Sequence, residues 1–443
     1  MSLNVGLKNI SDGASSSRMQ DNMFRVTVVA FEDRCNLNCG LRFAELLKQN
    51  SLFNVNFVNE PFPKGFLNLQ GRNFFDFIDQ GTKIIEANRS DIVVWGYEEN
   101  GKIRLNFQTG NQYVIPNNLH FSLLDSLFIP LSFFSNPESF PASLMLLISG
   151  IIIAAINPVT NEQKQNKPKL LDTVIKLLAE NTSPKDMSRE FMPFIMNMLA
   201  KVYLAGKQDN LSENDTEIIE NLLSNALKSE QYMRLPIYYG SIYNNFGQLY
   251  EAAFRKEFKE SFEYLKSAIK YYREAQKYHN RNYPFDYGLI SYHVATLYYE
   301  FWKQTGDLQA LRDAVSQMRE AEKVYTISQF PTSWSYIEGL LGYYLTCLGM
   351  ETQSNDIMQL AINSYHNKQK IYNQMSYPQE WATIQDEIGN IYYLLGKQNN
   401  DDNFMYEARN YFNSALEVYK RAKNKDAIQR TKQRLDKIKN YIV

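Results

Sequence analysis

The residues with the spacing closest to a chemical site are Cys35 and Cys39, a C-x-x-x-C pair within RCNLNCGLRF. Some four-iron clusters are held by a cysteine triplet that begins in this way, and three thiolates are needed. The expected third position after Cys39 is Arg42, and the third cysteine, Cys347, lies 347 − 39 = 308 residues further on. Zinc would also need more ligands, and the nearest histidine is His120. We therefore interpret the pair as structural, with a reversible thiol pair near a helix N-terminus as the alternative.

The histidines do not suggest a site either, because His120, His279, His293 and His366 are scattered along the sequence. No Gly-rich phosphate loop, H-x-x-x-H pair or G-x-S-x-G motif occurs. A lone histidine beside an aromatic residue, such as His293, is packed more often than it binds a metal. The sequence predicts no catalytic residue, no metal and no cofactor.

Length and composition indicate a folded protein with more than one domain. The chain has 443 residues, and one hydrophobic core rarely exceeds about 250–300 residues. Lys and Arg total 47 and Asp and Glu total 48, so the formal net charge of −1 gives no general attraction to nucleic acid or to an anionic membrane. Only three cysteines are present, and residues 1–23 read as a flexible polar leader without an apolar signal core. These features predict a cytoplasmic protein.

One apolar stretch, Ala142–Ile156 (ASLMLLISGIIIAAI), carries no charge. A helix needs about 20 residues to cross a bilayer, and this stretch has 15. We expect a buried helix between two domains, within a connecting region 135–168 that ends in a polar linker at Pro168. The alternative is a membrane anchor through residues 142–156.

Strand and helix patterns alternate in the N-terminal part of the chain. FRVTVVAFED alternates as a strand does, GLRFAELLKQN has helical spacing, and DIVVWGYEENGKIRLNFQT reads as a hairpin with its turn at Glu99–Gly101. A further extended piece is expected in YVIPNNLHFSL. These patterns predict a small layered α/β sheet over residues 24–134.

The order and the sequences of these strands, VTVVAFED and then SDIVVWGYEENGKIRL, resemble the TolB amino-terminal-like domain, which occurs in bacterial proteins beside helical repeats. The resemblance implies a sensing or binding module without catalytic residues. A ligand- or nucleotide-responsive site around Asp33 and Asn36, at a strand end, is the alternative for this domain.

The C-terminal half repeats itself. Four similar segments begin at Pro236, Pro284, Pro331 and Pro378, at steps of 284 − 236 = 48, 331 − 284 = 47 and 378 − 331 = 47 residues. An aromatic residue stands three positions after each proline, and a small residue follows eight positions later, where a neighbouring helix must come close. The second helix of each unit carries a face of the pattern small, large, small, as in Ala408, Phe412 and Ala415. A constant step of this length predicts stacked helical hairpins.

These residues make the region resemble tetratricopeptide (TPR) repeats of a lengthened kind. The resemblance implies an all-α solenoid, here over residues 169–443, with a degenerate unit from Phe191 and a polar capping helix at the end. Lys368 replaces the second small residue of its unit, so we expect looser packing there. The C-terminal run of Lys and Arg residues is interpreted as the solvated face of the cap, with a phosphate-binding strip as the alternative.

The resemblance also implies that the first helices line a concave groove that binds a partner. The groove positions transferred by alignment are Asn244, Gln248, Tyr292, Thr296, Tyr299, Tyr336, Tyr343, Asp386, Asn390 and Tyr393, with Glu251 and Thr346 beside them. This set contains no Lys or Arg, which disfavours an acidic tail as the ligand. Tyr and Asn side chains suit an extended or helical peptide. We predict a non-enzymatic adaptor that binds a protein or peptide and no nucleic acid, with the oligomeric state left open.

Overall fold

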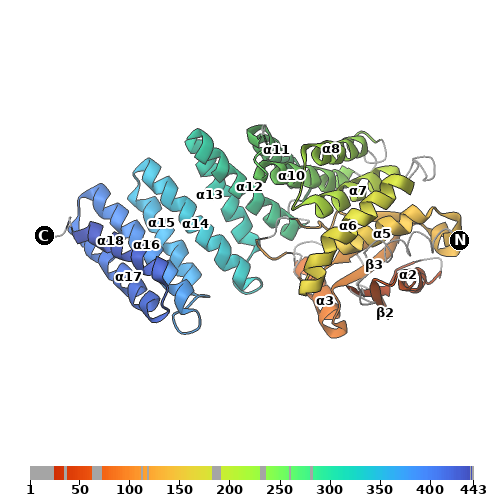
Figure 1. The fold of residues 1–443 in the computed structure, drawn as a ribbon, viewed down its shortest axis with the longest axis horizontal. Coiled ribbons are helices and arrows are strands. Elements are labelled where there is room, and N and C mark those ends of the chain that lie inside the picture. Colours follow the sequence, from red (N-terminus) through yellow and green to blue (C-terminus); the bar gives the residue numbers. More distant parts are fainter. Residues whose placement is uncertain are drawn as a thin grey trace. The chain divides into compact units, whose positions relative to one another are not determined.

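The computed structural model describes residues 24–33, 37–61, 72–110, 113–116, 119–181, 191–229, 236–258, 261–279, 283–439 and 441. The predicted leader 1–23, Cys35 and Asn36 lie outside these residues. The chain forms two compact units. Unit 1 comprises residues 1–113 and 117–287, and unit 2 comprises residues 114–116 and 288–443. Both units consist mainly of α-helices, and unit 1 also contains a β-sheet (Figure 1).

The sheet in unit 1 has five strands in the order β2-β1-β3-β4-β5. Strand β1 is parallel to β2 and β3, whereas β3, β4 and β5 are antiparallel. Its elements are β1 (Phe24–Ala30), α2 (Cys39–Lys48), β2 (Phe53–Pro61), α3 (Arg72–Asn88), β3 (Ile92–Glu99), β4 (Lys102–Gln108) and β5 (Leu127–Pro130). The predicted α/β layer is confirmed, including the hairpin, whose turn residues Asn100 and Gly101 both have positive φ.

The last strand is not where the sequence suggested. The extended piece expected in YVIPNNLHFSL is not a strand in the described residues 113–116 and 119–123, and β5 begins only at Leu127. The polar residues His120, Ser122 and Asp125 are buried in this region, where they bond to helices far away in the sequence. Arg104 of β4 also donates to the Ser126 hydroxyl and to the Leu123 carbonyl, so side chains, rather than the backbone pairing of a strand, hold this segment in place.

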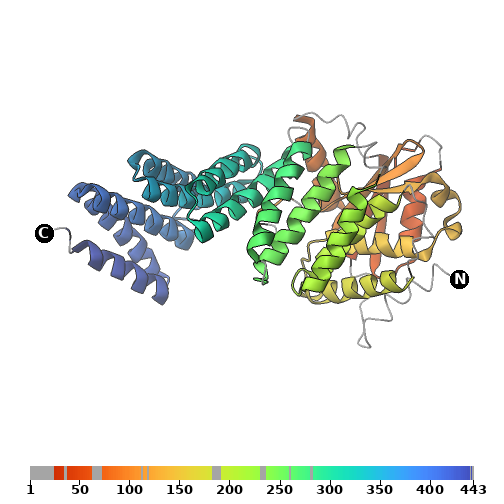
Figure 2. The ribbon, with the colours of Figure 1, turned by 90° about the horizontal axis from the view of Figure 1, so that it is seen from above.

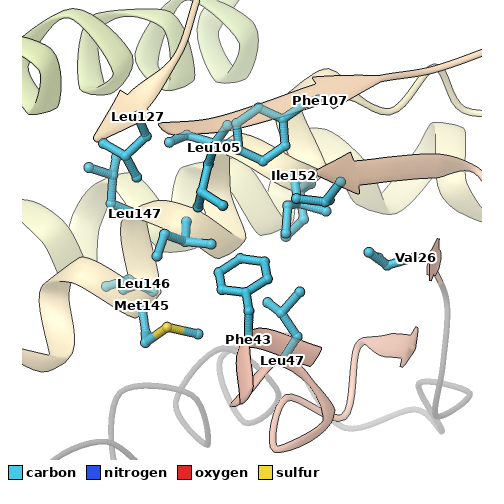
Figure 3. Close-up of a cluster of buried hydrophobic side chains, with 14 of the residues drawn as sticks. Val26, Phe43, Leu47, Leu105, Phe107, Leu127, Met145, Leu146, Leu147 and Ile152 are labelled. Carbon is cyan, nitrogen blue, oxygen red and sulfur yellow. The ribbon is translucent and has the colours of Figure 1, made fainter. Parts of the chain in front are cut away.

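Helix α5 (Ala142–Ala155) closes the core of unit 1. Figure 3 shows Met145, Leu146, Leu147 and Ile152 of α5 among side chains of α2, β4 and β5, such as Phe43. The same cluster of buried side chains extends to α6 (Asn161–Asn181) and α7 (Met192–Lys207). The sheet and the first long helices therefore share one hydrophobic core. Among the described residues, no helix has both the length and the apolarity needed to span a membrane.

Residues 161–168, predicted as part of a polar linker, form the first turns of α6. Gln163 stabilises the start of this helix, because its side-chain oxygen accepts hydrogen bonds from the main-chain N–H groups of Val159 and Thr160 at 2.8 and 3.3 Å. Lys167 also reaches back to the end of α5, where its ammonium donates to the carbonyls of Ala154 and Ile156 at 2.8 and 2.7 Å. These contacts explain how so polar a sequence is helical.

Within each unit, consecutive helices lie side by side as hairpin pairs, such as α10 with α11 and α16 with α17 (Figures 1 and 2). Unit 1 contains α8 (Glu213–Leu227), the short η3 (Pro236–Tyr238), α10 (Tyr239–Arg255), α11 (Ser261–His279) and the start of α12 (Pro284–Thr305). Unit 2 contains the rest of α12, α13 (Leu308–Val324), α14 (Pro331–Thr352), α15 (Asn355–Gln369), α16 (Pro378–Asn399), α17 (Asp402–Arg421) and α18 (Lys425–Lys439). The short α4 (Leu131–Ser135) and η2 (Pro137–Ser139) precede α5. The predicted helical solenoid is confirmed.

The small and large residues of each hairpin pack as the repeat pattern predicts. A Cβ atom added at Gly342 would lie 2.9 Å from the ring of Tyr365, and one at Gly389 would lie 2.9 Å from the ring of Phe412. At Lys368, the departure from the pattern is accommodated by Gly339, since an added Cβ there would lie 2.9 Å from the Lys368 ammonium. Glycine on the first helix thus makes room for a large residue on the second.

Candidate partner-binding surface

Part of the predicted groove is covered by the chain itself. In unit 1, Asn244 and Gln248 of α10 are buried, with 0% and 2% of their surface exposed. Gln248 contacts His120, which belongs to residues 119–126, here named the inner segment. The inner segment has no regular secondary structure, and its side chains from His120 onward are buried. The predicted groove residue Gln248 is therefore covered by the chain's own inner segment.

Side chains of the helices bind the main chain of the inner segment. The carbonyl of His120 accepts hydrogen bonds from the Lys201 ammonium at 2.5 Å and from the Gln248 amide at 3.1 Å. The N–H of Leu123 donates to the Asp286 carboxylate at 3.2 Å, and its carbonyl accepts from Arg104 at 3.0 Å. The inner segment is therefore held through its main-chain groups by side chains of α7, α10, α12 and β4.

A buried ion pair joins the inner segment to α7. Lys201 of α7 and Asp125 are both fully buried, and the Nζ–Oδ2 distance between them is 3.4 Å. The Lys201 ammonium also donates to Asn245 at 2.9 Å and to Gln248 at 2.7 Å, and Asp125 accepts from the Ser241 hydroxyl. Burial lowers the pKa of Lys201, while Asp125 opposes that shift. The pair is compensated by hydrogen bonds, as a buried charge must be.

Two further ionisable groups complete this network. Burial raises the pKa of Asp286 to about 8, and burial lowers the pKa of His279 to about 4. The His279 ring bonds through Nδ1 to the Ala275 carbonyl at 2.8 Å and through Nε2 to the Ser122 hydroxyl at 3.0 Å. Both residues therefore fasten the inner segment to α11 and α12. These bonds hold the inner segment in place.

A pocket of about 160 Å³ adjoins the first residue of the inner segment. It is lined by Leu119, Leu204, Gln208, Asp209, Gln248, Glu251, Ala252, Arg255 and Lys256. Glu251 is held there by Arg255 at 2.6 Å and by the Tyr272 hydroxyl at 2.8 Å. Pockets for drug-sized ligands and cofactors usually enclose about 300–1,000 Å³. This pocket has the size for a single side chain.

In unit 2, residues 114–116 of the same chain contact first helices. Ile115 is buried in a cluster that includes Tyr292 of α12 and Ile337 of α14. Its main-chain N–H donates to the Ser333 hydroxyl at 3.0 Å. A first helix therefore again binds a main-chain group through a side-chain oxygen.

Other predicted groove residues in unit 2 gather into an aromatic surface. Tyr292 and Tyr336 have ring centroids 6.2 Å apart, and Tyr299 and Tyr343 have centroids 5.5 Å apart with a 2.8 Å hydrogen bond between their hydroxyls. We name these four residues the tyrosine surface. Tyr336 is 37% exposed and Tyr343 is 43% exposed, whereas Tyr299 is half-buried and Tyr292 is buried. Thr296 is half-buried on the same helix as Tyr292 and bonds to the His293 carbonyl.

The predicted groove residues on α16 are Asp386, Asn390 and Tyr393. Asp386 and Tyr393 contact C-terminal residues rather than the tyrosine surface. Asp386 is buried and pairs with Arg434 of α18 at 2.9 Å, and its carboxylate also accepts from Thr431 at 3.2 Å. Tyr393 is half-buried with its ring centroid 6.2 Å from that of Tyr441, and Asn390 is half-buried. The C-terminal helix thus covers Asp386, while Lys432, Lys437 and Lys439 of its basic run are exposed.

The residues first considered for chemistry have structural contacts. Cys39 is the buried first residue of α2, and the Asp33 carboxylate accepts the main-chain N–H groups of Leu37 and Cys39 at 2.9 and 3.0 Å. Asp33 therefore caps a helix. Within the described part of the chain, no group of three or more His, Cys, Asp or Glu residues is placed to hold a metal ion.

Comparisons with known proteins show only distant similarity. No protein-family model matches the chain, and no curated protein matches it. Among solved structures, the Schizosaccharomyces pombe nuclear import adaptor Nro1 is 14% identical, with a TM-score of 0.35 over 58% of this chain and 88% of that protein. A circular tandem repeat protein is 13% identical, with a TM-score of 0.27 over 70% of this chain and 86% of that one. These similarities are too low to support a fold assignment, so the helical repeat architecture rests on the helices described above.

Proposed function

We propose that this chain is a non-enzymatic scaffold that binds an extended peptide segment of a partner protein on the first helices of its repeats. The observation that carries the proposal is the inner segment, because α7, α10 and α12 hold its main chain through Lys201, Gln248 and Asp286. A surface that recognises main-chain groups is suited to extended peptides of varied sequence. The tyrosine surface offers the same kind of helix face with exposed side chains.

The proposal includes the finer identities suggested by the sequence. We infer that the repeats are lengthened TPR units, supported by the packing of Gly342 and Gly389 against large residues of the second helix. We infer that the sheet is a TolB-like sensing or second binding module. We infer a cytoplasmic location, supported by the small number of cysteines, three in 443 residues.

The test is selection of peptides that bind the full chain. A display library of random dodecapeptides would be selected on the wild type, and the enriched peptides would be measured by fluorescence anisotropy. The triple variant Tyr299→Ala/Tyr336→Ala/Tyr343→Ala is expected to lower affinity more than tenfold, because exposed aromatic residues contribute most at such interfaces. Tyr406→Ala, which removes a tyrosine that is 41% exposed on α17, is the matched control.

Two outcomes would contradict the proposal. One is that no peptide is enriched on the wild type. The other is that enriched peptides bind the triple variant as tightly as they bind the wild type. Circular dichroism melting of both variants distinguishes loss of the surface from loss of the fold.

A further inference from the structure

The C-terminal hairpin of α17 and α18 carries more positive charge than its ion pairs neutralise. Residues 417–439 contain nine basic and three acidic residues. Four of the basic residues form ion pairs: Arg421 with Glu417, Lys439 with Asp436, and both Arg430 and Arg434 with the buried Asp386. The other five are exposed and form no ion pair within the described residues: Lys420, Lys423, Lys425, Lys432 and Lys437. With the exposed Asp426, which is likewise unpaired there, the uncompensated charge is 5 − 1 = +4.

Helix α18 presents two of these lysines on its outward face. Ala427, Thr431 and Ile438 are buried and mark the face of α18 that packs on the protein. Lys425 and Lys432 are seven residues apart, so both lie on the opposite face, about 10 Å from each other along the helix axis.

Two further lysines lie where the chain turns from α17 to α18. Lys420 belongs to the last turn of α17, and Lys423 has a left-handed backbone, with a φ of 55°, in the reversal between the two helices. Figure 1 shows this hairpin at the C-terminal end of unit 2. We name Lys420, Lys423, Lys425 and Lys432 the basic surface. All four are exposed, so no described element covers them.

The residue types on this surface indicate the kind of partner. The arginines of the hairpin, which could bind an anion through two parallel hydrogen bonds, are engaged with Glu417 and Asp386. The free groups are ammonium groups, which act as point charges without a preferred direction. No aromatic residue occurs in residues 420–439, so the bases of a single-stranded nucleic acid would have no ring to stack on. These features favour a partner that is attracted by charge alone.

The surface of an anionic bilayer is a partner of this kind. Its negative potential is continuous, so each lysine that reaches it strengthens binding by roughly fivefold without a fixed geometry. An exposed ion pair with a single peptide carboxylate contributes less, because two flexible side chains must be held in one position. Clusters of about four to eight basic residues on an amphipathic helix are typical of proteins that bind anionic lipids.

We propose that the basic surface binds the headgroups of an anionic phospholipid bilayer and so holds the chain at the surface of a membrane without entering it. This inference goes beyond the proposed function and does not depend on it, because the basic surface shares no residue with the tyrosine surface.

The experiment is co-sedimentation of the full chain with sucrose-loaded vesicles at low ionic strength. We expect binding to vesicles of equal parts phosphatidylserine and phosphatidylcholine, and none to phosphatidylcholine alone. The variant Lys420→Gln/Lys423→Gln/Lys425→Gln/Lys432→Gln should lower the partition by more than about a hundredfold, and added salt should also weaken binding. The same four positions changed to Arg keep the charge and should bind at least as tightly as the wild type.

The matched control removes four exposed lysines from α2 and α6 and changes the net charge by the same amount: Lys48→Gln/Lys164→Gln/Lys169→Gln/Lys176→Gln. It should retain binding to the phosphatidylserine vesicles. Circular dichroism melting of all variants shows whether each is folded.

Three results would overturn the inference: no sedimentation of the wild type with phosphatidylserine vesicles, equal sedimentation of the wild type and the four-Gln variant, or an equal loss in the matched control. Duplex DNA and polyglutamate are measured in parallel by fluorescence anisotropy. If either binds through the four lysines while the vesicles do not, the membrane inference is wrong and the surface binds that polyanion. The triple variant of the tyrosine surface should sediment as the wild type does, so failure of the peptide selection would leave this inference standing.

Discussion

Replacing Lys201 by Met is expected to destabilise unit 1 because it leaves Asp125 buried without its counter-charge. At an effective dielectric constant of about 20, two unit charges 3.4 Å apart attract by about 5 kcal/mol. The methionine keeps the apolar stem but removes the donor to the His120 carbonyl, Asn245 and Gln248. Loss of one partner of a buried pair costs about 3–5 kcal/mol, so we expect Lys201→Met to lower the free energy of unfolding by that amount.

The double variant Lys201→Met/Asp125→Asn shows whether the cost comes from the unpaired charge. We expect its destabilisation not to exceed that of Lys201→Met, since no charge is left uncompensated, and the coupling energy to be at least about 2 kcal/mol. Lys266→Met, which breaks an exposed ion pair with Glu263 on α11, is the control and should cost less than about 1 kcal/mol.

Hydrogen exchange measured by mass spectrometry suits a chain with two units, because each peptide reports on its own unit. Amides of β3 and β4 give the free energy of unit 1, and those of the inner segment show whether it is released first. Additive effects of the two substitutions, or a cost below about 1 kcal/mol for Lys201→Met, would refute the reasoning.

Three further outcomes follow from the packing and the ionisable groups. His279 has a folded-state pKa of about 4 and an unfolded value of about 6.5, so the unfolded state binds its proton first, and its contribution to stability should fall by about 3 kcal/mol as pH drops between these values. Asp286 acts in the opposite sense, so the check is the difference between the wild type and His279→Gln in urea unfolding, which should change by that amount over this pH range. Gly342→Ala should cost about 1–3 kcal/mol by crowding Tyr365, whereas Gly110→Ala, in open space, should leave the melting temperature unchanged. Ile152→Ala should cost about 2–5 kcal/mol in urea unfolding, because its side chain is fully buried; a cost below about 1 kcal/mol would contradict the core in Figure 3.

The repeats were predictable because their pattern is local and periodic. Pro284, Pro331 and Pro378 begin α12, α14 and α16, as the spacing indicated, whereas Pro236 begins a short 3-10 turn before α10. The pairing of a small residue on one helix with a large one on the next requires neighbours within about 25 residues, as Gly342 and Tyr365 show. This information is present in the sequence of each single repeat.

The inner segment could not be predicted in the same way. Ser122 bonds to His279 across 157 residues, and Leu123 bonds to Asp286 across 163 residues, so no local pattern connects them. A weak signal was present, because Lys201 lies within the apolar run MLAKVYLA and Asp125 within SLLDSLF. Charged residues in such runs are buried only when paired, and this rule would have marked both residues.

The predicted groove residues divide according to what covers them. Tyr336 and Tyr343 are exposed, whereas Gln248 is covered by the inner segment and Asp386 is paired with Arg434 of the capping helix. Alignment to a repeat family predicts which side chains lie on one face of a helix. It does not predict which of them are covered, because the segments that cover them come from distant parts of this chain. The binding role of these residues remains a prediction.

The most direct test of the scaffold account is photo-crosslinking of a selected peptide to the full chain. A benzoylphenylalanine in place of Tyr343 on α14 should crosslink to the peptide, and the same group in place of Tyr406 on α17 should not. Crosslinking at the position of Tyr406 with none at the position of Tyr343 would contradict the account.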